Sequence, residues 1–134
     1  MSMHRPYSAS EAHRLVVESR PVEDGVAMVK LQGEADLHTA PILRDALNEA
    51  IESKPETLIV DLTGVTFIDS MMLGVLLSAT RRARPNGTEL RIVVDDPHVR
   101  RIFELTLLDH VMKLYPSVEI ALSSSSAGER VSGD

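Results

Sequence analysis

The chain has 134 residues, a formal net charge of −6 and no cysteine. This length is enough for one domain with a real hydrophobic core. Without cysteine, the chain contains no disulfide, thiol nucleophile or thiolate metal ligand. Nucleic-acid binders usually carry a basic excess and stacking aromatic residues. The acidic balance, with two Tyr, two Phe and no Trp, therefore predicts no nucleic-acid partner.

Several other classes of site are missing from the sequence. No apolar run is long enough to span a membrane and no signal peptide opens the chain, so we expect a cytoplasmic protein without a membrane partner. The five histidines are scattered, without a His-x-x-x-His pair, and we expect no metal site and no cofactor. There is no Gly-rich phosphate loop and no nucleophile elbow. We therefore expect no catalytic residue and no enzyme activity.

The first part of the chain predicts two strands and an amphipathic helix. Residues 1–12 are polar, and we expect an irregular N-terminal segment there. The expected order is then strand, turn, strand and loop, at residues 13–19, 21–25, 26–31 and 33–36. Thr39 is the predicted N-cap of a helix with Pro41 in its first turn, and apolar residues at helical spacing continue it to about Ser53.

The central stretch, residues 57–79, is the most apolar part of the chain. A run rich in β-branched residues over 57–62 predicts a strand covered on both faces, followed by a turn at 63–66. Phe67 and Ile68 are expected to return the chain to the core. An apolar helix then begins, with Ser70 in the N-cap position. Because a helix N-terminus offers unpaired N–H groups and a positive dipole end, it would stabilise a phosphate on this serine.

The two methionines after Ser70 should differ in exposure. Adjacent residues on a helix cannot both face inward. We expect Met72 to be buried, on the stripe with Val75, Leu76 and Ala79, and Met71 to be its exposed neighbour.

The remaining chain predicts further alternation of strands and helices. A turn, a strand, a helix, a short strand and a final helical segment are expected at residues 85–87, 90–94, 97–106, 112–115 and 116–122. Arg91 and Asp95 alternate with apolar residues, so we expect the strand at 90–94 to have one solvated face. The arginines at 81–84 and 100–101 are interpreted as solvated helix surface. Residues 123–134 are Ser-rich and polar, and we expect a disordered tail.

The order of these elements predicts the fold class. Strands alternate with helices after residue 25, which favours an α/β domain with parallel strand pairs. The leading strand is expected to pair antiparallel with the second as a hairpin. We therefore predict a single domain over residues 13–122, with a mixed sheet of four or five strands and helices packed mainly on one face.

Three stretches resemble the STAS domain family of bacterial anti-sigma factor antagonists. They are Asp-Leu-Thr-Gly-Val-Thr-Phe-Ile-Asp-Ser at 61–70 continued by Leu-Gly at 73–74, Leu-Gln-Gly-Glu-Ala-Asp-Leu-His-Thr-Ala at 31–40, and Asp-His-Val at 109–111 with Leu-Tyr-Pro-Ser at 114–117. The resemblance covers roughly residues 14–122 and implies a STAS-like fold. In that family the serine after the signature aspartate is phosphorylated by a partner kinase, and this serine corresponds to Ser70.

The resemblance also implies a function and partners. The chain would bind an anti-sigma factor with serine kinase activity and so release a sigma factor. Phosphorylation of Ser70 by that kinase would end the complex, and a serine phosphatase would reset it. We expect a monomer or weak dimer. The expected partner-binding residues lie around Ser70 and before the first helix: Glu34, Asp36, Thr39, Asp69, Ser70, Met71 and Gly74.

The chain departs from the family pattern at two places. Met71 and Met72 stand where the family usually has Ser-Gly, and Leu107 stands where it tends to have Gly. The first departure favours an alternative, in which the chain is a non-switching STAS-like scaffold or a small-ligand-binding module and Ser70 is only a helix cap. Glu34 and Asp36 likewise have a simpler interpretation as solvated loop acids near a helix N-terminus.

Overall fold

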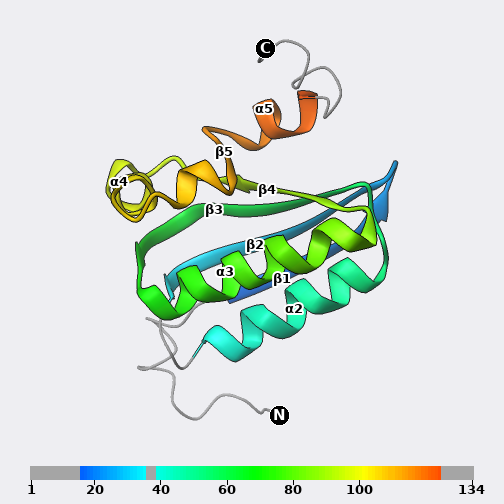
Figure 1. Cartoon of the computed structure of the whole chain (residues 1–134), viewed down its shortest axis with the longest axis horizontal. Helices are drawn as coiled ribbons and strands as arrows, with labels where there is room; N and C mark the ends of the chain where they lie inside the picture. Colours follow the sequence, from blue (N-terminus) through cyan, green and yellow to red (C-terminus); the bar gives the residue numbers. More distant parts are fainter. Residues whose placement is uncertain (1–15, 36–38, 125–134) are drawn as a thin grey trace.

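Five strands form one mixed sheet in the computed structural model, which describes residues 16–35 and 39–124 (Figure 1). The strands are β1 (Val16–Glu23), β2 (Val26–Ala35), β3 (Thr57–Ile68), β4 (Glu89–Val93) and β5 (Lys113–Tyr115). Their order in the sheet is β1-β2-β3-β4-β5. β1 pairs antiparallel with β2, and the other neighbours are parallel. The predicted α/β domain with a mixed sheet is confirmed. The expected N-terminal segment and most of the Ser-rich tail lie outside the described residues.

The helices are distributed unequally over the two faces of the sheet. They are α2 (Ala40–Glu52), α3 (Ser70–Ala83), α4 (Pro97–Leu105) and α5 (Val118–Ser123), with short 3-10 turns η2 (Arg84–Asn86) and η3 (Leu108–His110). α2 and α3 lie side by side on one face, and α5 lies on the opposite face (Figure 1). The main core is between the sheet and α2 and α3, and Val99 and Phe103 of α4 join it. Helices packed mainly on one face were therefore predicted correctly.

β2 and β3 are longer than the sequence predicts. β3 leaves β4 after the pair Asp61↔Val93, but it stays paired with β2 as far as Ala35↔Ile68. The loop expected at 33–36 is wrong for residues 33–35, and the turn expected at 63–66 is wrong throughout. The turn-forming residues of each segment find backbone partners on the other strand, about thirty residues away in sequence. The pairing between β2 and β3 therefore overrides the local turn propensity of these residues.

Gly64 allows the two strands to approach closely. A Cβ atom built on Gly64 would lie 2.7 Å from the Gln32 Cγ and 3.1 Å from the Leu31 carbonyl oxygen. The glycine therefore serves strand packing rather than a turn. Near it, the Asp61 carboxylate accepts a hydrogen bond of 3.0 Å from the Thr63 N–H, at the point where the ladder to β4 stops.

Arg91 is buried, contrary to the solvated strand face that the sequence predicts. Its side chain is held by Glu89 at 2.8 Å and donates to the carbonyl oxygens of Ala121 and Ser124, at the end of α5. Its guanidinium also lies 5.6 Å from the centre of the Tyr115 ring. α5 covers this face of the sheet, so the arginine satisfies carbonyl groups that the helix leaves unpaired. The covering helix follows the strand by many residues, and alternation within the strand does not reveal it.

Leu107, where the family resemblance implies Gly, has a left-handed backbone. It follows Thr106, the C-cap of α4, and has φ 63°, and the residue is 65% exposed. This conformation costs about 1–2 kcal/mol for a residue with a Cβ atom, whereas glycine adopts it freely. Leu107 therefore retains the turn geometry of a helix end at a cost in stability.

We predict that Leu107→Gly stabilises the domain by about 1 kcal/mol, because it relieves this strain. Urea unfolding would measure the change. The matched control is Leu105→Gly, since Leu105 is similarly exposed but is the last residue of α4. That change should destabilise the domain by about 0.5–1 kcal/mol. Equal loss of stability in both variants would contradict the assignment of strain to Leu107.

Candidate partner-binding site at the start of helix α3

Asp69, not Ser70, caps helix α3. Asp69 has extended backbone angles, and its carboxylate accepts a hydrogen bond of 3.0 Å from the Met72 N–H. Ser70 is the first residue of the helix. The predicted N-cap is thus wrong by one residue. Both residue types cap helices well, and the length of β3 decides between them because the extended backbone continues through Ile68 to Asp69.

The Ser70 hydroxyl is exposed at the start of α3. The Ser70 side chain is exposed and makes no hydrogen bond with any residue in the described part of the chain. It lies at the positive end of the α3 dipole, where a phosphate is favoured. The sequence has no Lys, Arg or His from residue 55 to residue 80, so its neighbours along the chain offer a phosphate no cationic side chain.

One of the two methionines is buried and the other is exposed, as predicted. Met72 is fully buried and Leu73 is 6% exposed, whereas Met71 is 49% exposed. A rotation of about 100° per residue separates the two. Gly74 lies one turn after Ser70 on the exposed side, and a Cβ atom there would meet no atom within 4 Å. The exposed surface of the first turns is therefore formed by Ser70, Met71 and Gly74.

Further apolar side chains are exposed at the same end of the molecule. β2 and β3 end there, and α2 and α3 begin there (left in Figure 1). Phe67 at the end of β3 is 48% exposed, and Ile42 in the first turn of α2 is 47% exposed. Phe67 was expected to face the core, and that prediction is wrong.

An irregular register explains the orientation of Phe67. The ladder passes from Gly33↔Val65 to Glu34↔Phe67, which leaves Thr66 as an extra residue on β3. Such a bulge changes the direction of the following side chain. Ile68 remains buried. Sequence alternation alone does not locate a bulge, so this exposed aromatic residue was missed.

The other predicted partner-binding residues, Glu34, Asp36 and Thr39, do not belong to helix α3. The backbone of Glu34 pairs with that of Phe67, which brings the end of β2 close to the start of α3. Asp36 lies outside the described residues. Thr39 occupies the N-cap position of α2 as predicted, but its side chain makes no capping bond and is 5% exposed. A partner would reach it only if the surrounding structure moved.

The described residues contain no group of three or more His, Asp or Glu side chains that could hold a metal ion. Among those same residues, no helix combines the length and apolar character needed to cross a membrane.

We predict that Asp69→Ala lowers the free energy of unfolding by about 0.5–2 kcal/mol, because it removes the cap. Ser70→Ala should change it by less than about 0.5 kcal/mol, since the exposed hydroxyl has no partner among the described residues. Chemical denaturation of both variants measures the difference. A larger loss for Ser70→Ala would assign the cap to the serine instead.

We predict an equally clear contrast between the methionines. Met72→Ala should cost about 2–5 kcal/mol because it leaves a cavity in the core. Met71→Ala should stay within about 0.5 kcal/mol, as is usual for surface changes. Thermal melting curves of the two variants test this, and similar destabilisation by both would show that Met71 also supports the core.

Comparisons with known proteins agree with this architecture. Residues 19–121 match the STAS domain. The chain is 32% identical to an anti-sigma F factor antagonist of Paenibacillus polymyxa over 74% of this chain and 86% of that protein. It is 31% identical to the anti-sigma-F factor antagonist RsfB of Mycobacterium tuberculosis over 78% and 85% of the two chains. A crystal structure of an anti-sigma factor antagonist from Mycobacterium paratuberculosis superposes with a TM-score of 0.76, at 31% identity, over 83% of this chain and 93% of that one. The chain therefore belongs to the STAS-domain family of anti-sigma factor antagonists.

Proposed function

We propose that this protein binds an anti-sigma factor through the surface around Ser70, and that phosphorylation of Ser70 ends the complex. The observation that carries the proposal is an exposed serine hydroxyl at the first position of a helix, beside the exposed Met71. The similarity to relatives named as anti-sigma factor antagonists supports an anti-sigma factor as the partner.

The apolar residues at this end would supply the binding energy. Met71, Phe67 and Ile42 each leave close to half of their side-chain surface in contact with water. Met and aromatic residues are enriched at protein interfaces, and burying them against a partner is favourable. Gly74 adds a place where a partner backbone or side chain can approach α3 closely, since open space surrounds it.

A phosphate on Ser70 would oppose that binding by its charge. It adds about −1.5 to −2 charges at pH 7. In the free protein, water and the N-terminal end of α3 stabilise this charge. In the complex it would be enclosed among apolar side chains, without a Lys or Arg from residues 55–80 to pair with it. Enclosing an unpaired charge in an interface costs several kcal/mol, so phosphorylation would release the partner and leave the fold intact.

The remaining residues would have supporting roles. Asp69 holds the start of α3 through its bond to the Met72 N–H, which fixes the position of the Ser70 backbone. Glu34 and Asp36 would present carboxylates to the partner from the segment before α2. The anti-sigma factor would itself be the serine kinase that uses ATP, and a serine phosphatase would remove the phosphate and restore binding.

The departure at Met71 and Met72 is compatible with this switch. Met72 belongs to the core, so a partner would meet only Met71. The departure therefore changes one exposed side chain, and we expect the partner to carry a matching apolar depression. If the kinase places no phosphate on Ser70, the alternative of a non-switching scaffold is favoured instead.

We predict that the cognate kinase and ATP place phosphate on Ser70, as mapped by mass spectrometry. Ser70→Ala should abolish this modification and still bind the anti-sigma factor. Ser70→Asp should fold normally and bind more than about tenfold more weakly, a loss of at least about 1.4 kcal/mol. Met71→Ala should weaken binding without lowering the melting temperature.

The matched control for the charge is Ser78→Asp. Ser78 is an exposed serine on the same helix, about 12 Å from Ser70 along the axis. The Ser78→Asp variant should bind the anti-sigma factor as tightly as the unmodified chain does. Phosphate found only at residues 123–126, or full binding by Ser70→Asp, would refute the switch.

A further inference from the structure

A second surface lies away from Ser70, beside the last described strand of the sheet. A hollow of about 730 Å³, open to solvent, is bordered by the run from Asp109 to Tyr115, which includes β5. Arg84, the first residue of η2, and Arg100 of α4 complete its walls. A neighbouring hollow of about 490 Å³ shares Arg84, Val111 and Lys113 with it. We call the larger hollow the basic groove.

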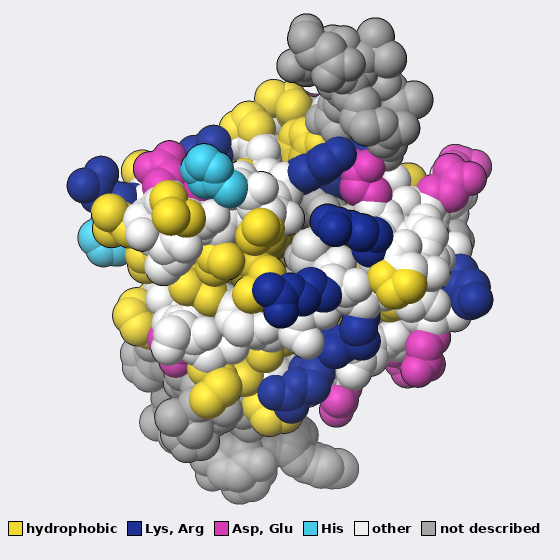
Figure 2. Space-filling view, in the orientation of Figure 1, with side chains coloured by type: hydrophobic (Ala, Val, Ile, Leu, Met, Phe, Trp, Pro, Cys, Tyr) yellow, Lys and Arg dark blue, Asp and Glu magenta, His cyan; other side chains and the backbone are white. Residues whose placement is uncertain are grey.

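The charge of the basic groove is opposite to that of the chain. Its lining carries three cations, Arg84, Arg100 and Lys113, against the carboxylate of Asp109, and Lys113 also pairs with Glu89 beside the groove at 3.3 Å. The whole chain, in contrast, has a net charge of −6. Figure 2 shows that the groove continues into a band of Lys and Arg side chains that crosses α3 toward α2. Arg81, Arg82 and Arg84 belong to the end of α3 and to η2, and neither element contains an acidic residue.

The arginines of the groove have spare capacity to bind carboxylates. The Arg84 guanidinium is exposed and makes no hydrogen bond or ion pair with the residues that the structure describes. Among the described residues, Arg100 pairs only with Glu104, at 3.5 Å, and both side chains are exposed. Exposed pairs of this kind contribute little, so Arg100 can exchange partners. Arginines near the C-terminus of a helix also complement the helix dipole, and Arg81 and Arg82 have this role in α3. The role does not explain Arg100, which belongs to α4.

The floor of the groove is partly apolar. Val111 is 51% exposed, and Leu114 is half-buried against the main core. A small ligand is usually enclosed by its pocket, whereas this hollow is open. Cationic walls beside an exposed apolar floor suit an extended peptide that carries both carboxylates and apolar side chains.

We propose that the basic groove binds an acidic segment of a protein partner. Carboxylates of that segment would pair with Arg84 and Arg100, and an apolar side chain would contact Val111. The Arg84 side of this groove lies away from the proposed phosphorylation site, because Arg84 is fourteen residues from Ser70 and about 21 Å away along the direction of α3. The two surfaces could therefore be occupied at once, and the proposal does not depend on modification of Ser70.

The test is a titration of the isotope-labelled full chain with a short peptide of alternating Glu and Val, followed by NMR. The largest shifts should occur at Arg84, Val111 and Leu114. Because exposed ion pairs are screened by salt, raising NaCl from 50 to 500 mM should weaken binding about tenfold. The double change Arg84→Glu and Arg100→Glu should weaken it by at least about tenfold, whereas Ser70→Asp should not alter it.

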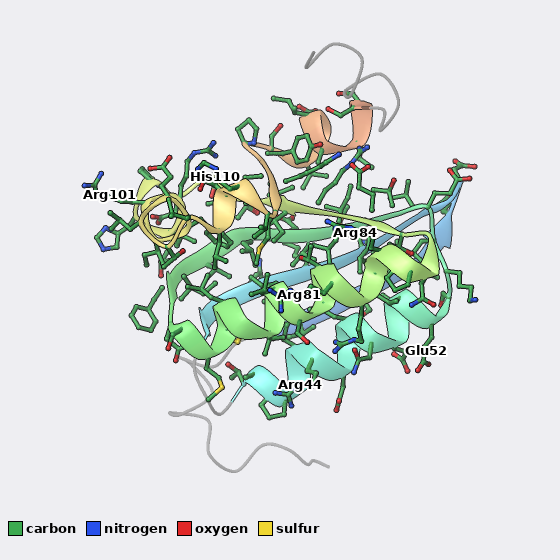
Figure 3. All side chains as sticks on the ribbon, viewed as in Figure 1. Arg44, Glu52, Arg81, Arg84, Arg101 and His110 are labelled. Carbon is green, nitrogen blue, oxygen red and sulfur yellow. The ribbon has the colours of Figure 1, made fainter. Side chains whose placement is uncertain are left out.

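Arg101→Glu is the matched control. Arg101 is an exposed arginine next to Arg100, but it points outward from α4 and does not line the groove (Figure 3). The Arg101→Glu variant should bind the peptide as tightly as the unchanged chain does. An equal loss in Arg101→Glu, or equal binding of a Lys and Val peptide, would overturn the proposal. So would larger shifts at these residues with duplex DNA or phosphatidylglycerol vesicles, which would assign the surface to another class of partner. Melting curves of all variants confirm that each is folded.

Discussion

The parallel pairing of β2 with β3 is the interaction on which the rest of the structure depends. This pairing continues beyond the point where β3 leaves β4. It extends both strands to the end of the molecule where α2 and α3 begin (Figure 1). Gly64 permits the close approach of these strands, and the bulge at Thr66 turns Phe67 outward. Ser70 owes its exposed position to this extension, because the strand ends only two residues before it. A change that shortened the ladder would therefore disturb the site without touching any of its side chains.

One side of helix α3 packs in the core, and the other side is exposed to solvent. Met72, Val75, Leu76 and Ala79 face the core, whereas Ser70, Met71 and Gly74 are exposed. Asp69 provides the cap, which leaves the Ser70 hydroxyl outside the network that holds the helix. A charge added to Ser70 would then act mainly on what binds there, since the fold does not rely on that hydroxyl. The length of the helix also divides the surface, with apolar residues near its start and arginines near its end (Figure 3).

The opposite face of the sheet is closed by a different kind of contact. α5 has six residues and buries only Ala121. Such a short helix has little apolar surface with which to stay in place. Arg91 compensates by donating to carbonyl oxygens at the end of α5 while Glu89 holds its other side. A buried charge is tolerated there because it is paired and hydrogen-bonded.

The sequence by itself determined the order of the elements, the family, the burial of Met72 and the exposure of Met71, because each depends on local periodicity or on a continuous motif. Tertiary structure decided the length of β2 and β3, the capping role of Asp69, the exposure of Phe67 and the burial of Arg91. In each of these cases, groups distant in sequence set the result. Residues of β2 pair with β3 about thirty positions later, and the carbonyl groups that hold Arg91 lie at least thirty positions after it. A hydrogen bond between such distant groups leaves no periodic trace in either segment, so only the folded chain reveals it.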